Sequence, residues 1–405
     1  MSENENRLET ARKIIERGVV TGALPDTESF IERLASTEPM RIYIGADPTS
    51  TALHLSHAKN YMLLEEFRKL GHEVIVLFGD FTARIGDPTD RATARKQLTS
   101  EEVRANVAEW LEQIKPLMDF EASENPPQVK FNADWLAKLT MEEVVHITSM
   151  VTVQRMLERD MFEKRMQEEK PIHLHEFLYP LMQGYDSVAM EVDAELCGTD
   201  QTFNALMGRT LLKNFKNKEK FVVTVNLMEN PKTGELMSKS RGTGVFLDTN
   251  AFDKYGSIMA QPDEMIEVIL INNTRLELTE IAEIMKAENP RDAKMRAAFE
   301  VTRIFHGEEA AKEAEHQFVN RVQQGGTDDE APEVVVSEAS QTVYSIVREA
   351  ADESVSNGEL RRLIEQGSVK INGEKMDDRD TTVEVPPEGL DLKIGKKQWF
   401  KVVLK

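Results

Sequence analysis

Residues 41–49 read RIYIGADPT, an apolar run that ends in a glycine and a polar turn. The run predicts a buried strand over Ile42–Gly45, and the residues after the turn predict a helix from near His54 to about Leu70. Gly71 and His72 end this helix, and Glu73–Phe78 predicts the next strand. Because strand, helix and strand in this order form a right-handed parallel crossover, the sequence predicts an α/β fold.

Open parallel sheets bind their ligands beyond the carboxyl ends of the strands, where Gly45–Thr49 and Gly79–Asp87 are expected to lie. No Gly-x-Gly-x-x-Gly follows the first strand, and the chain contains no Walker lysine loop. The sequence therefore disfavours a dinucleotide enzyme and a P-loop NTPase. A nucleotide would have to be held in another way.

Two short motifs are suited to ATP: His54-Leu55-Ser56-His57 and Leu236-Met237-Ser238-Lys239-Ser240. The two imidazoles are spaced by three residues, so they share one face at the start of the predicted helix. Lys239 lies in a polar, glycine-containing loop, where a mobile cation could close over phosphates during a reaction. By themselves, a surface histidine pair and a mobile surface turn remain alternatives.

A third constellation lies in residues 179–201. Tyr179, Gln183 and Asp186 are spaced by four and three residues and share one polar helical face. A strand predicted over Val192–Leu196 is followed by Cys197-Gly198-Thr199-Asp200-Gln201, which could place Asp200 on a ribose. An amphipathic helix with its polar side in solvent is the alternative, although Pro180 and Gly184 are poor choices for it.

Composition sets the class of protein. The chain has 405 residues, of which 40% are hydrophobic and 30% are charged, so we expect a soluble protein of two or three domains. We find neither a membrane-spanning run nor a secretory signal and expect a cytoplasmic protein with no membrane partner. A single cysteine, Cys197, excludes an internal disulfide and a thiolate zinc cluster from this chain alone.

The fold class that we predict is α/β: a Rossmann-like parallel-sheet catalytic domain with a helical insertion, an all-helical domain and a small α+β RNA-binding domain. The boundaries are 1–250 for the first, with the insertion at about 118–195, and 251–322 for the helical domain. A linker is predicted over 323–340, because its first part, residues 323–332, carries glycine, aspartate and proline without an apolar period. The small domain covers 341–405. Dimer contacts are expected in the insertion.

The net charge is -21, which argues against broad electrostatic adhesion to nucleic acid. The C-terminal residues 354–405 differ, since they carry ten Lys or Arg and nine Asp or Glu. A helix is predicted after the cap at Ser356, with Arg361 and Arg362 on its polar side, and a strand with a turn over Val369–Lys375. RNA could dock there, although a solvated, salt-bridged surface remains the alternative.

As a set, these motifs resemble the bacterial tyrosyl-tRNA synthetases, a family of class I aminoacyl-tRNA synthetases, over nearly the whole chain. His54–His57 resembles the family's HIGH signature, and Leu236–Ser240 resembles its KMSKS signature. The pattern Tyr179, Gln183 and Asp186 resembles its tyrosine-binding helix. Residues 289–294 resemble part of its helical anticodon-binding domain, and the tail resembles a small RNA-binding domain shared with a ribosomal protein and pseudouridine synthases.

The resemblance implies a two-step reaction. L-Tyrosine and ATP would give tyrosyl-adenylate and pyrophosphate, and the tyrosyl group would then pass to the 3′ end of tRNA(Tyr). Magnesium would arrive with ATP as substrate, and no protein-bound metal or organic cofactor is expected. A homodimer is also implied. Because the substrate carboxylate is itself the nucleophile, the protein would contribute orientation and charge stabilisation.

The resemblance also implies roles for individual residues. The expected catalytic residues are Thr49, His54, His57 and Lys239. The expected tyrosine-binding residues are Tyr43, Asp87, Tyr179, Gln183, Asp186 and Gln201, with Tyr43 and Asp186 on the phenol hydroxyl. The expected ATP-binding residues are Gly45, Asp47, Ser56, Gly198, Asp200, Met237, Ser238 and Ser240. The expected RNA-binding residues are Arg361, Arg362, Lys370 and Lys375.

The chain departs from the family pattern at three positions. Ser56 replaces the glycine of HIGH, Leu236 replaces the first lysine of KMSKS, and Cys197 stands where many relatives have glycine. Three rival functions remain: a tryptophanyl-tRNA synthetase, another HIGH-type nucleotidyltransferase, and an inactive paralogue that binds structured RNA. Asp186 and the C-terminal tail favour tyrosine over tryptophan, and the helical domain and tail disfavour another nucleotidyltransferase. Lys239 and the full tyrosine set argue against an inactive paralogue.

Overall fold

The computed structural model describes residues 3–87, 99–237, 243–320, 331–351, 355–387, 389–395 and 398–405. It divides into two compact units, residues 1–308 and 309–405, each of which is described by itself. None of the helices in the described part is both long and apolar enough to cross a lipid bilayer.

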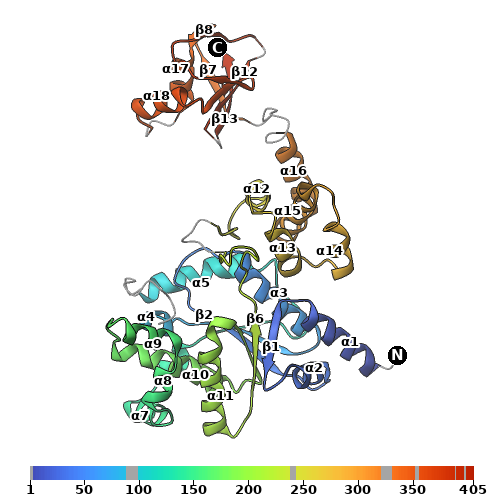
Figure 1. The fold of residues 1–405 in the computed structure, drawn as a ribbon, viewed down its shortest axis with the longest axis vertical. Helices are drawn as coiled ribbons and strands as arrows, with labels where there is room; N and C mark the ends of the chain where they lie inside the picture. The colour runs from blue at the N-terminus through green and yellow to red at the C-terminus, as the bar shows by residue number, and fades with distance from the viewer. Residues whose placement is uncertain are drawn as a thin grey trace. The chain divides into compact units, whose positions relative to one another are not determined.

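The first unit is built on a six-stranded sheet whose order is β1-β6-β5-β2-β3-β4 (Figure 1). Its strands are β1 (Val20–Leu24), β2 (Arg41–Ala46), β3 (Glu73–Phe78), β4 (Gln128–Phe131), β5 (Ala194–Gly198) and β6 (Phe221–Val225). Five strands are parallel, and only the edge strand β1 is antiparallel to its neighbour β6. The predicted α/β fold is therefore confirmed.

The first crossover lies where the sequence predicts it. Helix α3 (Leu55–Lys69) connects β2 to β3, and Gly71 follows it with a φ of 96°, a conformation that favours glycine. The central strands are almost fully buried, which explains their continuous apolar sequence. Tyr43 on β2 packs with Ile75 and Leu77 of β3 in the core beneath the sheet.

Helices surround this sheet. In the first half they are α1 (Glu3–Glu16), α2 (Thr27–Ala35), α4 (Thr82–Ile85) and α5 (Ser100–Ile114). Between β4 and β6 they are α6 (Ala133–Leu136), α7 (Met141–Ser149), α8 (Val153–Leu157), α9 (Asp160–Gln167), η1 (Leu174–Phe177), α10 (Leu178–Met190), η2 (Thr199–Gln201) and α11 (Thr202–Lys216). The predicted helical insertion is largely helical, but our pattern missed β4, a short edge strand within it.

Helices α10 and α11 run side by side (Figure 1). A Cβ atom on Gly184 would lie 3.1 Å from the backbone nitrogen of Gly208, so the two glycines let the helices approach closely. This contact explains why a glycine occupies a helix interior, where it otherwise costs stability. The helix is therefore not the surface helix of the alternative interpretation.

The first unit continues through α12 (Ala251–Met259), α13 (Met265–Asn273), α14 (Leu278–Ile284) and α15 (Pro290–His306). All four lie within residues 251–322, for which the sequence predicts a helical domain. Arg17 donates to three carbonyl oxygens, at Ile271, Thr274 and Leu276, so the helical segment is tied to the N-terminal part. The boundary predicted at residue 250 stays a prediction.

The second unit contains α16 (Glu308–Phe318), α17 (Val343–Ala350) and α18 (Asn357–Glu365). Its strands are β7 (Glu333–Val336), β8 (Ser340–Thr342), β9 (Val369–Ile371), β10 (Glu374–Met376), β11 (Thr382–Glu384), β12 (Leu390–Ile394) and β13 (Gln398–Leu404). They form a five-stranded sheet, β10-β9-β12-β13-β7, and the pair β11-β8. Ser356 caps α18, as predicted, by accepting from the backbone of Glu359.

The predicted linker 323–340 falls partly outside the described residues, which resume at 331. Strand β7 lies within that predicted range and pairs in parallel with β13. It contributes Val336 to the core of the small unit, beside Leu360 and Leu392. The small unit therefore includes residues of β7 that lie within the range predicted to be linker.

Candidate active site

The first motif forms the N-terminus of α3. His54 is the N-cap residue, and its backbone N–H donates to Nδ1 of His57 over 3.2 Å. Because Nδ1 of His57 accepts this bond, a neutral imidazole carries its proton on Nε2. Burial, with the neighbouring His54 and Lys59, lowers the pKa of His57 to about 3. His57 is therefore a neutral hydrogen-bond donor at physiological pH.

The segment that follows the second motif is joined to the first motif. Leu55 donates its N–H to the carbonyl of Val245 over 3.0 Å, and Leu247 donates to the carbonyl of Leu53 over 2.9 Å. His54 and Phe246 form an antiparallel bridge between these two bonds. Two segments nearly two hundred residues apart in sequence thus meet at the helix start. Ser238, Lys239 and Ser240 lie outside the described residues.

The flanks of the second motif are ordered. Met237 is buried and donates its N–H to Met228 over 2.9 Å, whereas Leu236 is 40% exposed. Leu236 therefore presents an apolar side chain where the family pattern has a lysine. Ser56, which replaces the glycine of the family's first motif, is half-buried in the first turn of α3.

Asp47, at the end of β2, lies against two hydroxyl groups. Its carboxylate accepts from Thr82 over 2.6 Å and from Tyr179 over 2.9 Å. Burial raises its pKa to about 7, against the opposing effect of these bonds. A Cβ on Gly79 would lie 2.0 Å from this carboxylate, so the site requires glycine there. Asp47 was expected beside adenosine, and the structure places it against Tyr179.

Asp186 is 2% exposed and holds two donors. Trp135 Nε1 donates to one carboxylate oxygen over 2.8 Å, and Asn132 Nδ2 donates to the other over 3.2 Å. Burial raises the pKa of Asp186 well above its usual range. Tyr43 is also buried, and its hydroxyl lies 3.1 Å from Ser187 Oγ. Ser187 follows Asp186 directly in α10, so this contact brings Tyr43 to the segment that carries Asp186.

A chain of amides connects the next group of predicted residues. Gln201 donates to Asp87 over 2.7 Å, and Asn204 donates to Gln201 over 2.8 Å and to Gln183 over 2.9 Å. Arg159 lies 3.4 Å from the other oxygen of Asp87. The predicted residues Asp87, Gln183 and Gln201 are therefore brought together.

A buried ion pair lies at the base of this network. Lys220 and Glu195 are in contact, and their side chains are 0% and 3% exposed. Lys220 also donates to Ser187 Oγ over 2.7 Å, and Glu195 accepts from Gln183 over 3.2 Å. Because Ser187 contacts Tyr43, the ion pair joins the phenol-side residues to the amide chain. Buried charges of this kind need such partners.

The remaining predicted positions lie at the same edge of the sheet. Thr49 donates its backbone N–H to the carbonyl of Asp47 over 2.8 Å. A Cβ on Gly198 would lie 2.4 Å from the carboxylate of Asp200, and burial raises the pKa of Asp200. Gly45 is exposed, and a Cβ there would make ordinary contacts. A side chain at position 79 or 198 would collide with a neighbouring carboxylate, so these two positions require glycine. Position 45 does not require it for packing within the protein.

Sequence reasoning missed eight residues of this network. They are Thr82, Asn132, Trp135, Arg159, Ser187, Glu195, Asn204 and Lys220. Only one of them left a local signal: Thr82 follows the strand end at Gly79, in a loop already expected at the ligand-binding edge. The others come from helices, a strand terminus and a predicted insertion, and tertiary packing alone brings them to the site.

The C-terminal unit presents a row of lysines. Lys370 on β9 is paired with Lys375 on β10 and with Lys393 on β12, so all three share one face. Like charges directly opposite one another destabilise a sheet, which makes this row a natural contact for a polyanion. Lys393 Nζ also lies 4.4 Å from the centre of the Trp399 ring.

The predicted arginines lie on α18. Arg361 lies over the ring of Tyr344, with 5.6 Å between the guanidinium carbon and the ring centre. Arg362 is 3.9 Å from Glu359. Both side chains are accessible enough for a partner, but one already faces an acid.

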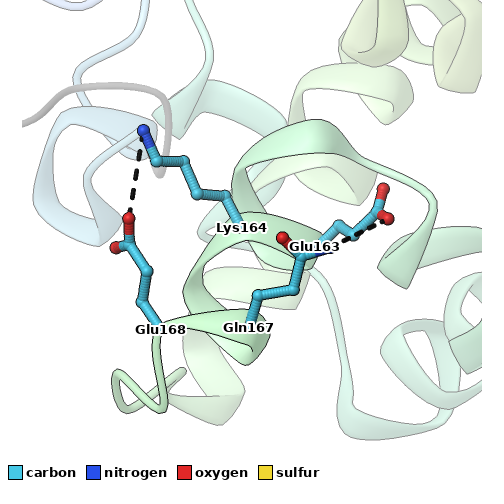
Figure 2. Close-up of a pocket in the computed structure, with 4 residues that line it drawn as sticks. All are labelled: Glu163, Lys164, Gln167 and Glu168. Carbon is cyan, nitrogen blue, oxygen red and sulfur yellow. Dashed lines mark hydrogen bonds and ion pairs between the residues drawn. The ribbon is translucent and has the colours of Figure 1, made fainter.

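Neither a surface hollow nor the arrangement of possible metal ligands indicates a further ligand site in the described part of the chain. A shallow hollow of about 410 Å³ is lined by Glu163, Lys164, Gln167 and Glu168, all at the end of α9 (Figure 2). Its polar groups mainly pair with one another, as in the Lys164–Glu168 contact at 3.9 Å. In the described part of the chain, no group of three or more His, Cys, Asp or Glu is arranged to hold a metal ion.

Comparisons with known proteins give the family. The family model for tRNA synthetases class I (W and Y) matches residues 35–323. The tyrosine--tRNA ligase of Moorella thermoacetica is 40% identical over 398 residues, which cover 96% of this chain and 95% of that protein.

The fold has solved counterparts. A C-terminally truncated mitochondrial tyrosyl-tRNA synthetase of Aspergillus nidulans superposes with a TM-score of 0.64 and 24% identity, over 78% of this chain and 98% of that one. The tryptophanyl-tRNA synthetase of Plasmodium falciparum has a TM-score of 0.56 and 14% identity, over 77% and 89%. These likenesses confirm the fold but do not distinguish the two amino acids. The match over most of the chain shows that this protein belongs to the class I tRNA synthetases of the tryptophan and tyrosine family.

Proposed function

We propose that the protein is a tyrosine--tRNA ligase, which activates L-tyrosine with ATP and transfers it to the 3′ end of tRNA(Tyr). The observation that carries the proposal is Asp186, a buried carboxylate held by Trp135 and Asn132, whose neighbour in the chain, Ser187, contacts the hydroxyl of Tyr43. A buried acid is suited to bond a phenol hydroxyl, whereas phenylalanine would leave it unpaired. The 40% identity to a tyrosine--tRNA ligase over almost the full length supports the same substrate.

We propose that the amino group of the substrate lies near Asp87, Tyr179 and Gln183. The amide chain through Gln201 and Asn204 fixes Asp87 and Gln183 before the substrate arrives, and a hydrogen bond to Asp47 fixes Tyr179. Preorganised groups lose little freedom on binding, so more of the interaction is available to orient the reacting carboxylate. Tyr43 and Asp186 would then hold the far end of the substrate.

On the nucleotide side, we propose that His54, His57 and Thr49 face the phosphates of ATP, with Lys239 completing the site. The neutral His57 offers an Nε2–H donor to the charge that develops on the α-phosphate. Asp200 would hold the ribose beyond the end of β5. Magnesium would enter as the ATP complex, because the side chains gathered here are imidazoles and amides with separated carboxylates, and phosphate oxygens can supply the missing ligands.

We further propose that the protein works as a homodimer in the cytoplasm. Five large apolar side chains are exposed on α7, α8, α9 and η1. They are Met141 (77%), Val145 (58%), Val153 (66%), Met166 (55%) and Leu174 (82%). Apolar groups gathered on neighbouring helices are typical of an interface. Light scattering should give twice the chain mass, and the double variant Met141→Glu/Leu174→Glu should reduce it to one chain.

The experiment that tests the function is amino-acid-dependent exchange between pyrophosphate and ATP. Tyrosine, phenylalanine and tryptophan are supplied in turn to the full chain, without tRNA. Exchange with tyrosine alone supports the proposal. Exchange with tryptophan alone would indicate a tryptophanyl-tRNA synthetase instead. Folded protein that exchanges with none of them would favour an inactive RNA-binding paralogue. Charging of tRNA(Tyr) with labelled tyrosine then tests the second step.

A further inference from the structure

Arg159 is a buried cation that the family motifs leave without a role. It occupies the N-cap position of α9, and the residue is 5% exposed. Its guanidinium carbon lies 5.9 Å from the ring centre of Phe162 and 5.7 Å from that of Phe203. Two aromatic rings thus confine the group. Burial lowers the pKa of Arg159, and Asp87 opposes this effect.

Its hydrogen bonds are incomplete. Nη2 reaches Asp87 at 3.4 Å, which is long for an ion pair. Nη1 is buried and finds no partner among the described residues. A buried donor without a partner is costly, more so when it is charged, and native structures rarely keep one. We therefore expect a bound ligand to supply a hydrogen-bond acceptor for Nη1 of Arg159.

The surroundings indicate what the acceptor is. Asp87 is shared by Arg159 and Gln201, and the charge of Arg159 also acts on Tyr179 and Asp200. If Asp87 and Tyr179 receive a substrate ammonium group, the carboxylate on the same carbon must lie within a few ångströms of that ammonium. The guanidinium of Arg159 is the cation beside that position, and its planar donors match a carboxylate.

We propose that Arg159 binds the α-carboxylate of the tyrosine substrate through its unpaired Nη1. The proposal rests on the function proposed above. Arg159 would hold one carboxylate oxygen while the other forms its bond to the α-phosphorus of ATP. The bond between that phosphorus and the bridging oxygen to the β-phosphate then breaks, and pyrophosphate leaves with the electron pair. Arg159 thus orients the nucleophile.

The test compares two ligands that differ only in the carboxylate. Tyramine retains the ammonium and phenol groups of tyrosine and lacks the carboxylate. Binding of each to the full-length protein, without ATP, is measured by calorimetry. In Arg159→Met, tyrosine binding should weaken by about 10- to 100-fold, the range for hydrogen bonds to charged groups. Tyramine binding should change by less than about threefold, since it makes no bond to Arg159.

Two further variants make the result specific. Arg159→Lys should retain part of the tyrosine affinity, and it gives the same comparison if the Met variant fails to fold. Arg165→Met removes a second mostly buried arginine of α9, which pairs with Glu176 outside the network, and should leave the ratio of the two affinities unchanged. Circular dichroism checks that each variant is folded.

Equal losses for tyrosine and tyramine would overturn the proposal, because they would indicate a structural role. Unchanged tyrosine binding with a slower exchange reaction would also overturn it. That result would indicate that Arg159 contacts a phosphate of ATP instead. Tyrosine-dependent exchange by the unaltered protein distinguishes these failures from a failure of the proposed function. If that exchange occurs and the affinity ratio does not shift, only the role of Arg159 is wrong.

Discussion

The proposed nucleotide side and the proposed amino-acid side of the site are built in different ways. The nucleotide side depends on a local motif, in which His54 and His57 are held together by one turn of helix. The amino-acid side depends on a network in which Asp186 is fixed by Asn132 and Trp135 from other elements. A short motif can therefore mark the first side, whereas the second exists only in the folded chain.

The difference also concerns charge. His57 is neutral, and its proton position is set by a backbone bond. On the proposed amino-acid side, burial raises the pKa of Asp186, and it also raises the pKa of Asp47, which lies against Tyr179 of that side. We therefore expect substitutions on the two sides to affect different kinetic constants: turnover on the nucleotide side, and affinity and selectivity on the amino-acid side.

The largest effect is expected at the phenol end. Asp186→Ala should reduce the preference for tyrosine over phenylalanine by at least about 100-fold, from a native ratio on the order of 10⁴ to 10⁵. That native ratio was measured in this same enzyme family, and it reflects a buried polar group left unpaired by phenylalanine. The measurement is kcat/KM for both amino acids in pyrophosphate exchange. The exposed Asp134→Ala provides a control, and an unaltered preference in Asp186→Ala would contradict the phenol assignment.

The second prediction concerns the nucleotide side. His57→Ala should lower kcat for adenylate formation by about 100- to 1000-fold, as for the loss of one preorganised donor, with a smaller change in KM for ATP. Because the pKa of His57 is about 3, its charge should not change between pH 6 and 9. Single-turnover rates check the effect, with the exposed His146→Ala as the matched variant. A loss confined to KM would show that His57 binds the ground state only.

The third prediction uses pH to separate the two sides. Asp47 has a raised pKa of about 7, so its carboxyl group is protonated below that pH and loses its charge beside Tyr179, one of the residues proposed for the substrate amino group. KM for tyrosine should rise as pH falls below 7, by up to about tenfold per pH unit. KM for ATP should not follow this trend. Asp47→Asn should give a flat tyrosine profile, and a profile that keeps its slope in this variant would assign the titration to another group.

The same group affects stability. The folded state binds the proton of Asp47 more tightly than the unfolded state does, since folding raises its pKa. The free energy of unfolding should therefore fall as pH rises from about 4 to 7, and Asp47→Asn should remove this contribution. Urea unfolding of the two proteins across this pH range measures it.

The smallest effect is expected in the second unit, on the lysine row of Lys370, Lys375 and Lys393. Lys370→Gln and Lys375→Gln should each weaken tRNA binding only a few-fold and reduce the slope of log affinity against log salt by about one. Pyrophosphate exchange should remain unchanged, because it needs no tRNA. Lys405→Gln serves as a charge-matched control. A variant that loses exchange as well would contradict the prediction that the C-terminal unit serves tRNA binding and not amino-acid activation.

Particular residues show how far the sequence alone determined this protein. The alternation of apolar strands with the helix from His54 to Leu70 was sufficient for the α/β fold, because burial and helical period are local properties. The spacing of Tyr179, Gln183 and Asp186 placed them on one helical face for the same reason. The cap at Ser356 and the hairpin turn at Asn372 and Gly373 were likewise local.

Tertiary structure decided the rest. Strand β4 is short and lies at an edge, so its apolar signal is weak, and Asn132 and Trp135 reach Asp186 only because β4 pairs with β3. Arg159 and Lys220 resembled ordinary charged residues in sequence, and only burial reveals that their charges need partners within the site. The sequence determined which backbone elements form, since these depend on neighbours along the chain. Which side chains share the buried polar network depended on packing between distant segments, which no local pattern records.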